Sequence, residues 1–240
     1  MDLQGKTALV TGGAKRVGKA IVLGLARAGC NLVLHYNTSA GEAEATAAEA
    51  RALGAQVVLV RADLVADAAR AMAGAAELAP VEILINSAAG FPVDTILDIA
   101  PDTFDHTIAV NLRAPILLTA AFARALPDDR QGAVVNLTDW RTQRPYGNHF
   151  SYTVSKGGID TFTVGAAEAL APRIRVNAVA LGAILPPPGK GSAYLKELAN
   201  EIPVEHVGGT DPVVEAVLFL LRNDFITGEI LRVDGGAHLR

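Results

Sequence analysis

Residues 11–18 are Thr11-Gly12-Gly13-Ala14-Lys15-Arg16-Val17-Gly18, and they stand between an apolar run at residues 7–10 and a helical pattern at residues 19–28. Small residues at such a junction let the backbone approach a pyrophosphate, and the N-terminus of the following helix offers N–H groups and a positive dipole end. A glycine cluster alone is weak evidence, because turns also need glycine. Its position between a first strand and a first helix indicates a dinucleotide-binding loop.

The rest of the chain continues this alternation of strand and helix. Continuous apolar runs, typical of strands covered on both faces, predict strands at residues 7–10, 31–35, 56–61, 83–85, 133–137, 175–179 and 230–233. Helical patterns lie between them at residues 19–28, 40–52, 65–76, 101–125, 152–171 and 212–221, and residues 186–189 (Pro-Pro-Pro-Gly) form a loop. Strict alternation favours a parallel sheet wrapped by helices. We therefore expect an α/β fold, a Rossmann-type doubly wound parallel sheet, in a single domain over residues 1–240.

Composition excludes several classes of protein. Half of the 240 residues are hydrophobic, 19% are charged and the formal net charge is −4, so neither a disordered chain nor a nucleic-acid or anionic-membrane partner is expected. Cys30 is the only cysteine and the five histidines form no ligand-spaced cluster, so we expect no disulfide and no metal site. The first residues lack the features of a signal peptide, and no uncharged apolar run reaches the roughly 20 residues of a membrane span. A cytoplasmic location is the prediction.

The end of the second strand indicates which nicotinamide cofactor is bound. NAD-binding domains usually carry a carboxylate there for the ribose hydroxyls, and that charge would repel a 2′-phosphate. Here the segment is His35-Tyr36-Asn37-Thr38-Ser39, without an acid, and Lys15 and Arg16 add positive charge nearby. The alternative is that both cations are solvated loop residues. The sequence favours NADP(H).

Tyr152 and Lys156 stand at positions i and i+4, so a helix places them on one face. The phenol of an unperturbed tyrosine is a poor acid–base group at neutral pH. A neighbouring ammonium and an oxidised nicotinamide both favour the phenolate, so we expect Lys156 to lower the pKa of Tyr152. By itself this spacing also occurs in surface pairs.

Taken with the loop at residues 11–18, these residues resemble the short-chain dehydrogenases/reductases, whose usual loop is Thr-Gly-x-x-x-Gly-x-Gly. Arg16 replaces the middle glycine, as in the pteridine reductases, whose loop resembles Thr-Gly-Ala-Ala-Lys-Arg-Leu-Gly. The resemblance runs from Thr7 to Arg240 and implies an NADP(H)-dependent oxidoreductase. It also implies that Asp63-Leu64 contacts the adenine and that the protein is a homotetramer packed through its long fourth and fifth helices. An Arg often stands at position 38 in pteridine reductases, and here it is Thr38, which leaves open how the 2′-phosphate is held.

Thirteen residues before the tyrosine the family usually has a serine, and this chain has Asp139. An Asp in that position resembles the pteridine reductases and the bacterial dihydromonapterin reductases. A carboxylate there can accept hydrogen bonds from the amino and ring N–H groups of a pterin and take part in the proton relay. The alternatives are that Asp139 caps a turn, or that Thr138 supplies a hydroxyl, although strand alternation would point Thr138 to the other face. Asn111 matches the family asparagine that kinks a helix and holds a water of the relay.

Three further segments carry the resemblance. After the fourth strand, Asn86-Ser87-Ala88-Ala89-Gly90-Phe91 places Phe91 where pteridine reductases have a phenylalanine that stacks on the pterin, although a core contact is the alternative. Ser87 and Ala89 depart from that pattern. After the sixth strand, Leu181-Gly182 stands for the family's Pro-Gly, and the final His-Leu-Arg resembles dihydromonapterin reductases, whose C-terminus lies near the substrate.

The sequence therefore predicts a reductase that transfers hydride from NADPH to a pterin, with catalytic residues Tyr152, Lys156, Asp139 and Asn111. A carbonyl reductase acting on a 3-oxoacyl thioester or a sugar is the alternative, and an NADP-binding protein without catalysis is a third. The expected cofactor contacts are Gly12, Lys15, Arg16, Val17, Gly18, Tyr36, Asn37, Thr38, Ser39, Asp63, Leu64, Asn86, Ser87, Ala88, Tyr152, Lys156 and Gly182. The expected substrate contacts are Phe91, Asp139, Tyr152 and Arg16.

Overall fold

The structure is a computed structural model that describes residues 1–73, 78–186 and 192–240. Seven parallel strands form one sheet in the order β3-β2-β1-β4-β5-β6-β7. Their bounds are β1 Thr7–Val10, β2 Asn31–Tyr36, β3 Val57–Arg61, β4 Val81–Asn86, β5 Gly132–Asp139, β6 Ile174–Leu181 and β7 Ile230–Val233. This confirms the predicted Rossmann-type doubly wound fold. Chain order reverses between β1 and β4, and in such sheets ligands bind beyond the strand ends at this reversal.

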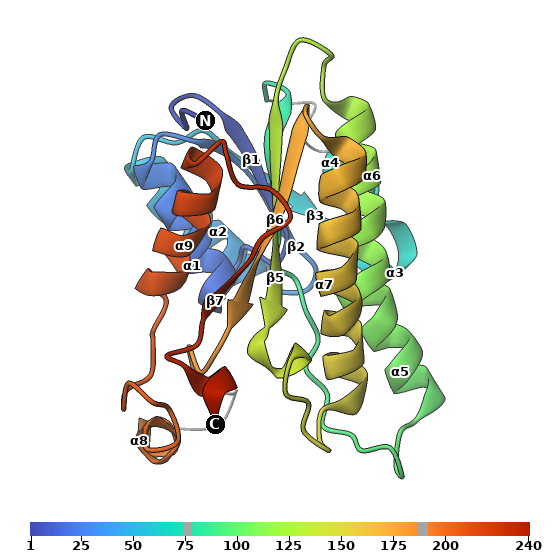
Figure 1. Ribbon diagram of the computed structural model, residues 1–240. Helices are drawn as coiled ribbons and strands as arrows, with labels where there is room; N and C mark the ends of the chain where they lie inside the picture. The colour runs from blue at the N-terminus through green and yellow to red at the C-terminus, as the bar shows by residue number, and fades with distance from the viewer. Residues whose placement is uncertain (74–77, 187–191) are drawn as a thin grey trace.

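Helices cover both faces of the sheet (Figure 1). One face carries α1 (Arg16–Arg27), α2 (Ala40–Ala52) and α9 (Asp211–Arg222), and α1 packs on both of the others. The other face carries α6 (Ala114–Ala125) and α7 (Phe150–Leu170). Each layer encloses its own hydrophobic cluster, one around Ile21 and Leu25, the other around Phe122. Strands β1 and β4 are buried along their whole length, which explains the apolar runs at residues 8–10 and 83–85.

The predicted helix at residues 101–125 forms with a change of geometry in its middle. It consists of α5 (Pro101–Ile108), a π-helical turn (Ala109–Arg113) and α6. Pro115 has no N–H to donate to the carbonyl of Asn111, so the α pattern cannot continue there and the turn widens. By length and composition, Pro101–Ala125 is the one stretch among the described residues that could cross a membrane, with mean hydropathy 1.3. In this fold α6 instead packs on β4 and β5.

The prediction of one helix over residues 65–76 was wrong. The chain forms two short helices, α3 (Leu64–Asp67) and α4 (Arg70–Ala73), and residues 74–76 lie outside the described residues. The side chain of Asp67 accepts a hydrogen bond from the backbone N–H of Arg70 at 3.1 Å, which ends one helix and starts the next. A further helix, α8 (Ser192–Ala199), was not predicted. Of the predicted loop at residues 186–189, only Pro186 is described.

Candidate active site

The loop after β1 is built so that only glycine fits at two positions. Gly12 has φ +65°, and a Cβ there would lie 2.9 Å from the Cα of Ala88. A Cβ on Gly18, in the first turn of α1, would collide with the carbonyl oxygen of Gly12. The backbone of the loop therefore stays bare at the N-terminus of α1, where helix N–H groups favour an anion. His35 fixes the loop, because its Nδ1 accepts from the Gly12 N–H at 3.2 Å while its Nε2 lies 3.1 Å from the Ala62 carbonyl.

Arg16 takes the left-handed conformation that its position demands, with φ +56°. A residue with a Cβ pays about 1–2 kcal/mol for this conformation, which is why a glycine is the easier choice there. Its guanidinium donates to the carbonyl oxygen of Pro186, beyond β6, at 2.7 Å. Lys15 remains exposed beside the loop. Both cations line the cavity described next, and of the two only Arg16 has a hydrogen-bond partner among the described residues.

A cavity of about 510 Å³ opens at the reversal point of the sheet. Fifteen of the predicted cofactor contacts line it: Gly12, Lys15, Arg16, Val17, Gly18, Tyr36, Asn37, Thr38, Ser39, Asp63, Leu64, Ser87, Ala88, Tyr152 and Lys156. Two do not. Asn86 is buried below it and donates to Asn136 at 2.8 Å, and Gly182 lines a second cavity.

Among the described lining residues of this first cavity, Asp63 is the only acid. Its carboxylate is occupied, because Oδ1 accepts from the N–H of Val65 at 2.9 Å and so caps α3. Asn37 and Thr38 follow β2 directly and are exposed. The end of β2 therefore offers uncharged hydrogen-bonding groups and no carboxylate that would repel a phosphate.

Tyr152 and Lys156 lie on the face of α7 that packs on the end of β5, and both are buried. The Tyr152 hydroxyl donates to Asp139 Oδ2 at 2.9 Å. Asp139 Oδ1 accepts from the Arg141 N–H at 2.9 Å, so the carboxylate also caps the turn that follows β5. Lys156 Nζ donates to the Leu137 carbonyl at 2.7 Å. The sequence offered two alternative roles for Asp139, capping a turn and pairing with the tyrosine, and the carboxylate fills both, one with each oxygen.

The expected effect of Lys156 on Tyr152 was wrong for the chain without cofactor. Burial and then the charge of Asp139 raise the pKa of Tyr152 well above its ordinary value. Burial lowers the pKa of Lys156 to about 8, despite the opposing charge of Asp139. Burial also raises the pKa of Asp139 itself. Loss of hydration outweighs pairing here, so the phenol is held protonated.

The Asn111 side chain is fully engaged by protein groups. It accepts from the Gly90 N–H at 2.8 Å and donates to the Gly90 carbonyl at 2.9 Å and to Ser155 Oγ at 3.1 Å. It thereby fixes the segment after β4 that ends in Phe91. The π turn is what brings Asn111 to this position.

A second cavity, of about 850 Å³, adjoins the first. Asp139, Gly182 and Arg240 line it, and Phe91 is the one described residue that lines both cavities. The Phe91 ring makes an edge contact with the Tyr152 ring, with 4.6 Å between centroids. One face of Phe91 is covered by the imidazole of His149, stacked at 3.8 Å and 13°. Thr138 lines the first cavity and Asp139 the second, as strand alternation requires.

The chain is similar to known proteins along almost its whole length. Residues 12–238 match the family model described as enoyl-(acyl carrier protein) reductase. A short-chain dehydrogenase/reductase from Serratia marcescens superposes with a TM-score of 0.91 at 30% identity, covering 99% of this chain and 100% of that one. The chain belongs to the short-chain dehydrogenase/reductase family.

Other members of the family are equally similar. The L-xylulose reductase of Mesocricetus auratus is 34% identical over 98% of both chains. The putative ketoacyl reductase 2 of the granaticin polyketide synthase of Streptomyces violaceoruber is 33% identical, over 97% of this chain and 96% of that one. The structure of FolM alternative dihydrofolate reductase 1 from Brucella canis, complexed with NADP, has a TM-score of 0.94 at 35% identity and covers 100% of this chain and 97% of that one.

Sequence reasoning missed a set of contacts that hold the start of α7 to the segment after β4. Asp94 is buried and accepts from the Ser151 N–H at 3.2 Å and from the Ser151 hydroxyl. His149, at φ +53°, lies 2.6 Å through Nδ1 from the Pro92 carbonyl and stacks on Phe91. These contacts set Phe91 relative to the start of α7. The only sequence signal is an acid followed 57 residues later by a serine, which predicts nothing by itself.

Proposed function

We propose that this short-chain dehydrogenase/reductase is an NADPH-dependent reductase of a pterin ring. The observation that carries the proposal is the hydrogen bond from the Tyr152 hydroxyl to Asp139 at the wall of the second cavity. A carboxylate stands where a carbonyl reductase of the family uses a serine hydroxyl. The FolM structure, named an alternative dihydrofolate reductase, supports the same substrate class.

The first cavity fits NADP(H). Gly12 and Gly18 place no side chain at the N-terminus of α1, where helix N–H groups favour a pyrophosphate, and a Cβ on either would clash with the backbone of Ala88 or of Gly12. Asn37, Thr38 and the exposed ammonium of Lys15 are available to the 2′-phosphate. The bound cofactor supplies the hydride. Solved relatives in this family are described in complex with NADP or NADPH.

The chain's own residues supply and hold the proton. Tyr152 holds its proton at neutral pH, but its raised pKa makes it a weaker acid than a free phenol, so donation during reduction requires charges in the filled site that favour the phenolate. As a carboxylate Asp139 can accept from an N–H of a pterin, and its raised pKa favours sharing of the proton that the Tyr152 hydroxyl donates to it. Lys156 reaches the Leu137 carbonyl beside the first cavity, in position to hold a cofactor ribose. Asn111 positions Gly90 and, through it, Phe91.

A carbonyl reductase is the second candidate function, and two observations favour it. The L-xylulose and ketoacyl reductases are as similar in sequence as the FolM structure, and Ser87 and Ala89 depart from the pteridine reductase pattern. Against it, the hydroxyl of Thr138, the nearest substitute for the missing serine, is buried and donates to the Lys156 carbonyl at 3.4 Å.

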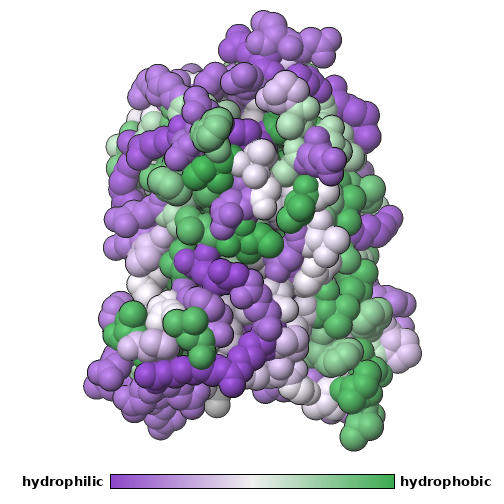
Figure 2. All heavy atoms as spheres, viewed as in Figure 1, coloured by the Kyte–Doolittle hydropathy of each residue, from purple (hydrophilic) through white to green (hydrophobic). Residues whose placement is uncertain are grey.

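Assembly as a cytoplasmic homotetramer is part of the proposal. The outer faces of α6 and α7 expose apolar side chains, among them Leu117, Val154 and Val164, each between 45% and 53% exposed. Figure 2 shows apolar side chains gathered along this side of the molecule. Such a surface supports packing of copies through these two helices.

Steady-state kinetics of Asp139→Ser and Phe91→Ala on a dihydropterin and on a 3-oxoacyl thioester test the proposal. Asp139→Ser removes a charge-assisted hydrogen bond worth about 1.5–3 kcal/mol, so kcat/KM for the pterin falls roughly ten- to hundredfold. Phe91→Ala weakens pterin binding with little change in NADPH affinity. Higher thioester than pterin activity in the wild type, rising further in Asp139→Ser, would establish the carbonyl reductase instead.

A further inference from the structure

Arg141 occupies an unusual position at the wall of the second cavity. It belongs to the 3₁₀ turn Trp140–Thr142, which Asp139 caps directly after β5. Its guanidinium carbon lies 5.7 Å from the centroid of the Phe91 ring and 5.3 Å from that of the Tyr146 ring. Two cation–π contacts therefore hold the side chain in one place.

The charge of the guanidinium lowers the pKa of Asp139, against the larger effect of burial, but the two groups form no salt bridge. Across the described parts of the chain the guanidinium makes no hydrogen bond and no ion pair, and its Nε is buried without an acceptor. The carboxylate closest in sequence, Asp139, is occupied by the Tyr152 hydroxyl and by the backbone N–H of Arg141 itself. A guanidinium carries five N–H donors, and stacking on rings leaves the donors in its plane free. Arg141 thus presents donors from which no described residue accepts a hydrogen bond.

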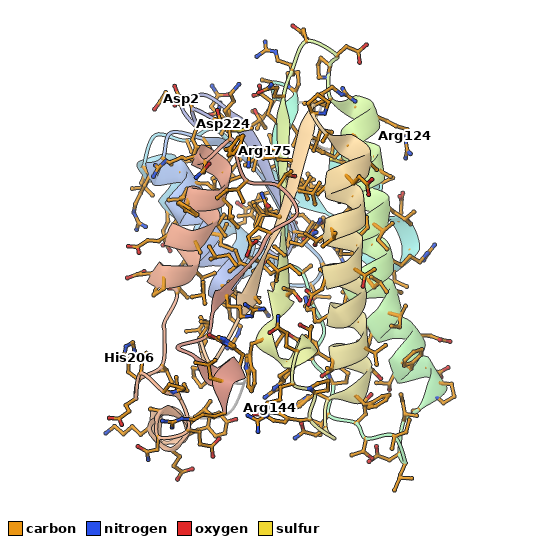
Figure 3. The ribbon with its side chains drawn as sticks, viewed as in Figure 1. Asp2, Arg124, Arg144, Arg175, His206 and Asp224 are labelled. Carbon is orange, nitrogen blue, oxygen red and sulfur yellow. The ribbon has the colours of Figure 1, made fainter. Side chains whose placement is uncertain are left out.

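The surroundings of Arg141 add positive charge. Arg144 and Arg240 line the same cavity, whereas Asp139 and Glu201 are its only acids among the described residues. Arg144 lies on the loop after β5, toward the end of the molecule where Figure 1 marks the C-terminus (Figure 3). The volume of about 850 Å³ is near the upper end of cavities that hold drug-sized ligands, so it has room for more than a bicyclic ring.

We propose that Arg141 forms an oxyanion-binding subsite, so that the natural substrate carries a carboxylate or a phosphate group in addition to the ring or carbonyl that is reduced. Both groups accept two parallel hydrogen bonds from a guanidinium. The inference rests on the proposed function in taking the second cavity as the substrate site, but it does not depend on a pterin ring.

Binding can be measured without turnover, because Trp140 is the only tryptophan of the chain and lines this cavity. With NADP⁺ present, Trp140 fluorescence is titrated with p-aminobenzoyl-L-glutamate and with its uncharged diethyl ester. We expect the wild type to bind the acid at least about tenfold more tightly than the ester. Equal affinities in the wild type overturn the proposal, and this comparison needs no variant. Phenyl phosphate as a third probe distinguishes a phosphate subsite from a carboxylate subsite.

Variants assign the effect to the residue. Arg141→Gln should weaken binding of the acid by about ten- to hundredfold and leave the ester unchanged, and Arg141→Lys should restore part of the loss. Arg144→Gln is the matched control, an exposed arginine of the same cavity without ring contacts. The proposal is wrong if Arg144→Gln alone reproduces the loss, or if Arg141→Gln weakens acid and ester equally. If acid binding depends on Arg141 but no dihydropterin is reduced, the subsite stands and the pterin assignment falls.

Discussion

Replacing Asn37 with aspartate adds one negative charge to the cofactor cavity and changes almost nothing else. Asn37 is exposed, directly follows β2 and lines the cavity, where Lys15 is the exposed cation available to the 2′-phosphate. Because the position is exposed, an effective dielectric constant of about 60 applies, and unit charges about 6 Å apart then interact by roughly 1 kcal/mol. The phosphate carries about −1.5 to −2 charges near pH 7. Repulsion should therefore cost about 1.5–2 kcal/mol, or roughly ten- to thirtyfold in NADPH affinity.

The assay compares kcat/KM for NADPH and NADH with one acceptor substrate. We expect the wild type to prefer NADPH by at least about tenfold, or 1.4 kcal/mol, and Asn37→Asp to lose most of this preference while its NADH value stays level. Added salt should shrink the effect, because the charges are exposed. Asn200→Asp is the control, with the same charge at an exposed residue outside the cofactor cavity. An equal fall for both cofactors, or no change for NADPH, would refute the reasoning.

Three further predictions concern the catalytic helix. Tyr152→Phe removes only the hydroxyl, so turnover should fall by roughly 10²–10⁴-fold with cofactor affinity retained; a near-normal kcat would exclude Tyr152 as the proton donor. The pKa of Lys156 is lowered to about 8 from 10.5, so between these values the unfolded chain holds a proton that the folded chain has lost. The unfolding free energy of the cofactor-free protein should therefore rise with pH from about 8 to 10.5 relative to Lys156→Met, measured by urea titration; parallel pH profiles would contradict this. Asp94→Ala breaks the buried hydrogen bonds to Ser151, which should lower the unfolding free energy by about 1.5–3 kcal/mol and Tm by roughly 4–10 °C. It should also reduce kcat more than NADPH affinity. An unchanged Tm would contradict the assigned role.

Features that depend on local pattern could be predicted from the sequence. Strands covered on both faces carry apolar runs, so the runs at residues 8–10 of β1 and 83–85 of β4 were recognisable, and the loop at Gly12 and Gly18 was recognisable because no side chain fits there. The break between α3 and α4 was missed, because a single side-chain cap from Asp67 outweighs the propensity of an alanine-rich segment for helix.

Features that depend on residues far apart in sequence could not be predicted. The stacking of His149 on Phe91 joins residues 58 positions apart, and only the folded chain brings them together. The predicted lowering of the Tyr152 pKa was wrong for a related reason. Spacing on a helix shows which charge is near, whereas burial, which here has the larger effect and the opposite sign, is a property of the packed molecule.

The two cavities are lined mainly by different segments of the chain, so mutations can change one cavity with little effect on the other. Segments after β1, β2 and β3 contribute only to the first cavity, whereas the turn after β5, the segment after β6 and the C-terminal residues supply most of the second. Phe91 alone among the described residues belongs to both. Mutations in the turn after β5, the segment after β6 and the C-terminal residues can therefore change the second cavity while the loops after β1, β2 and β3 stay the same. Binding of the cofactor in the first cavity then need not be lost when the shape or charge of the second cavity changes.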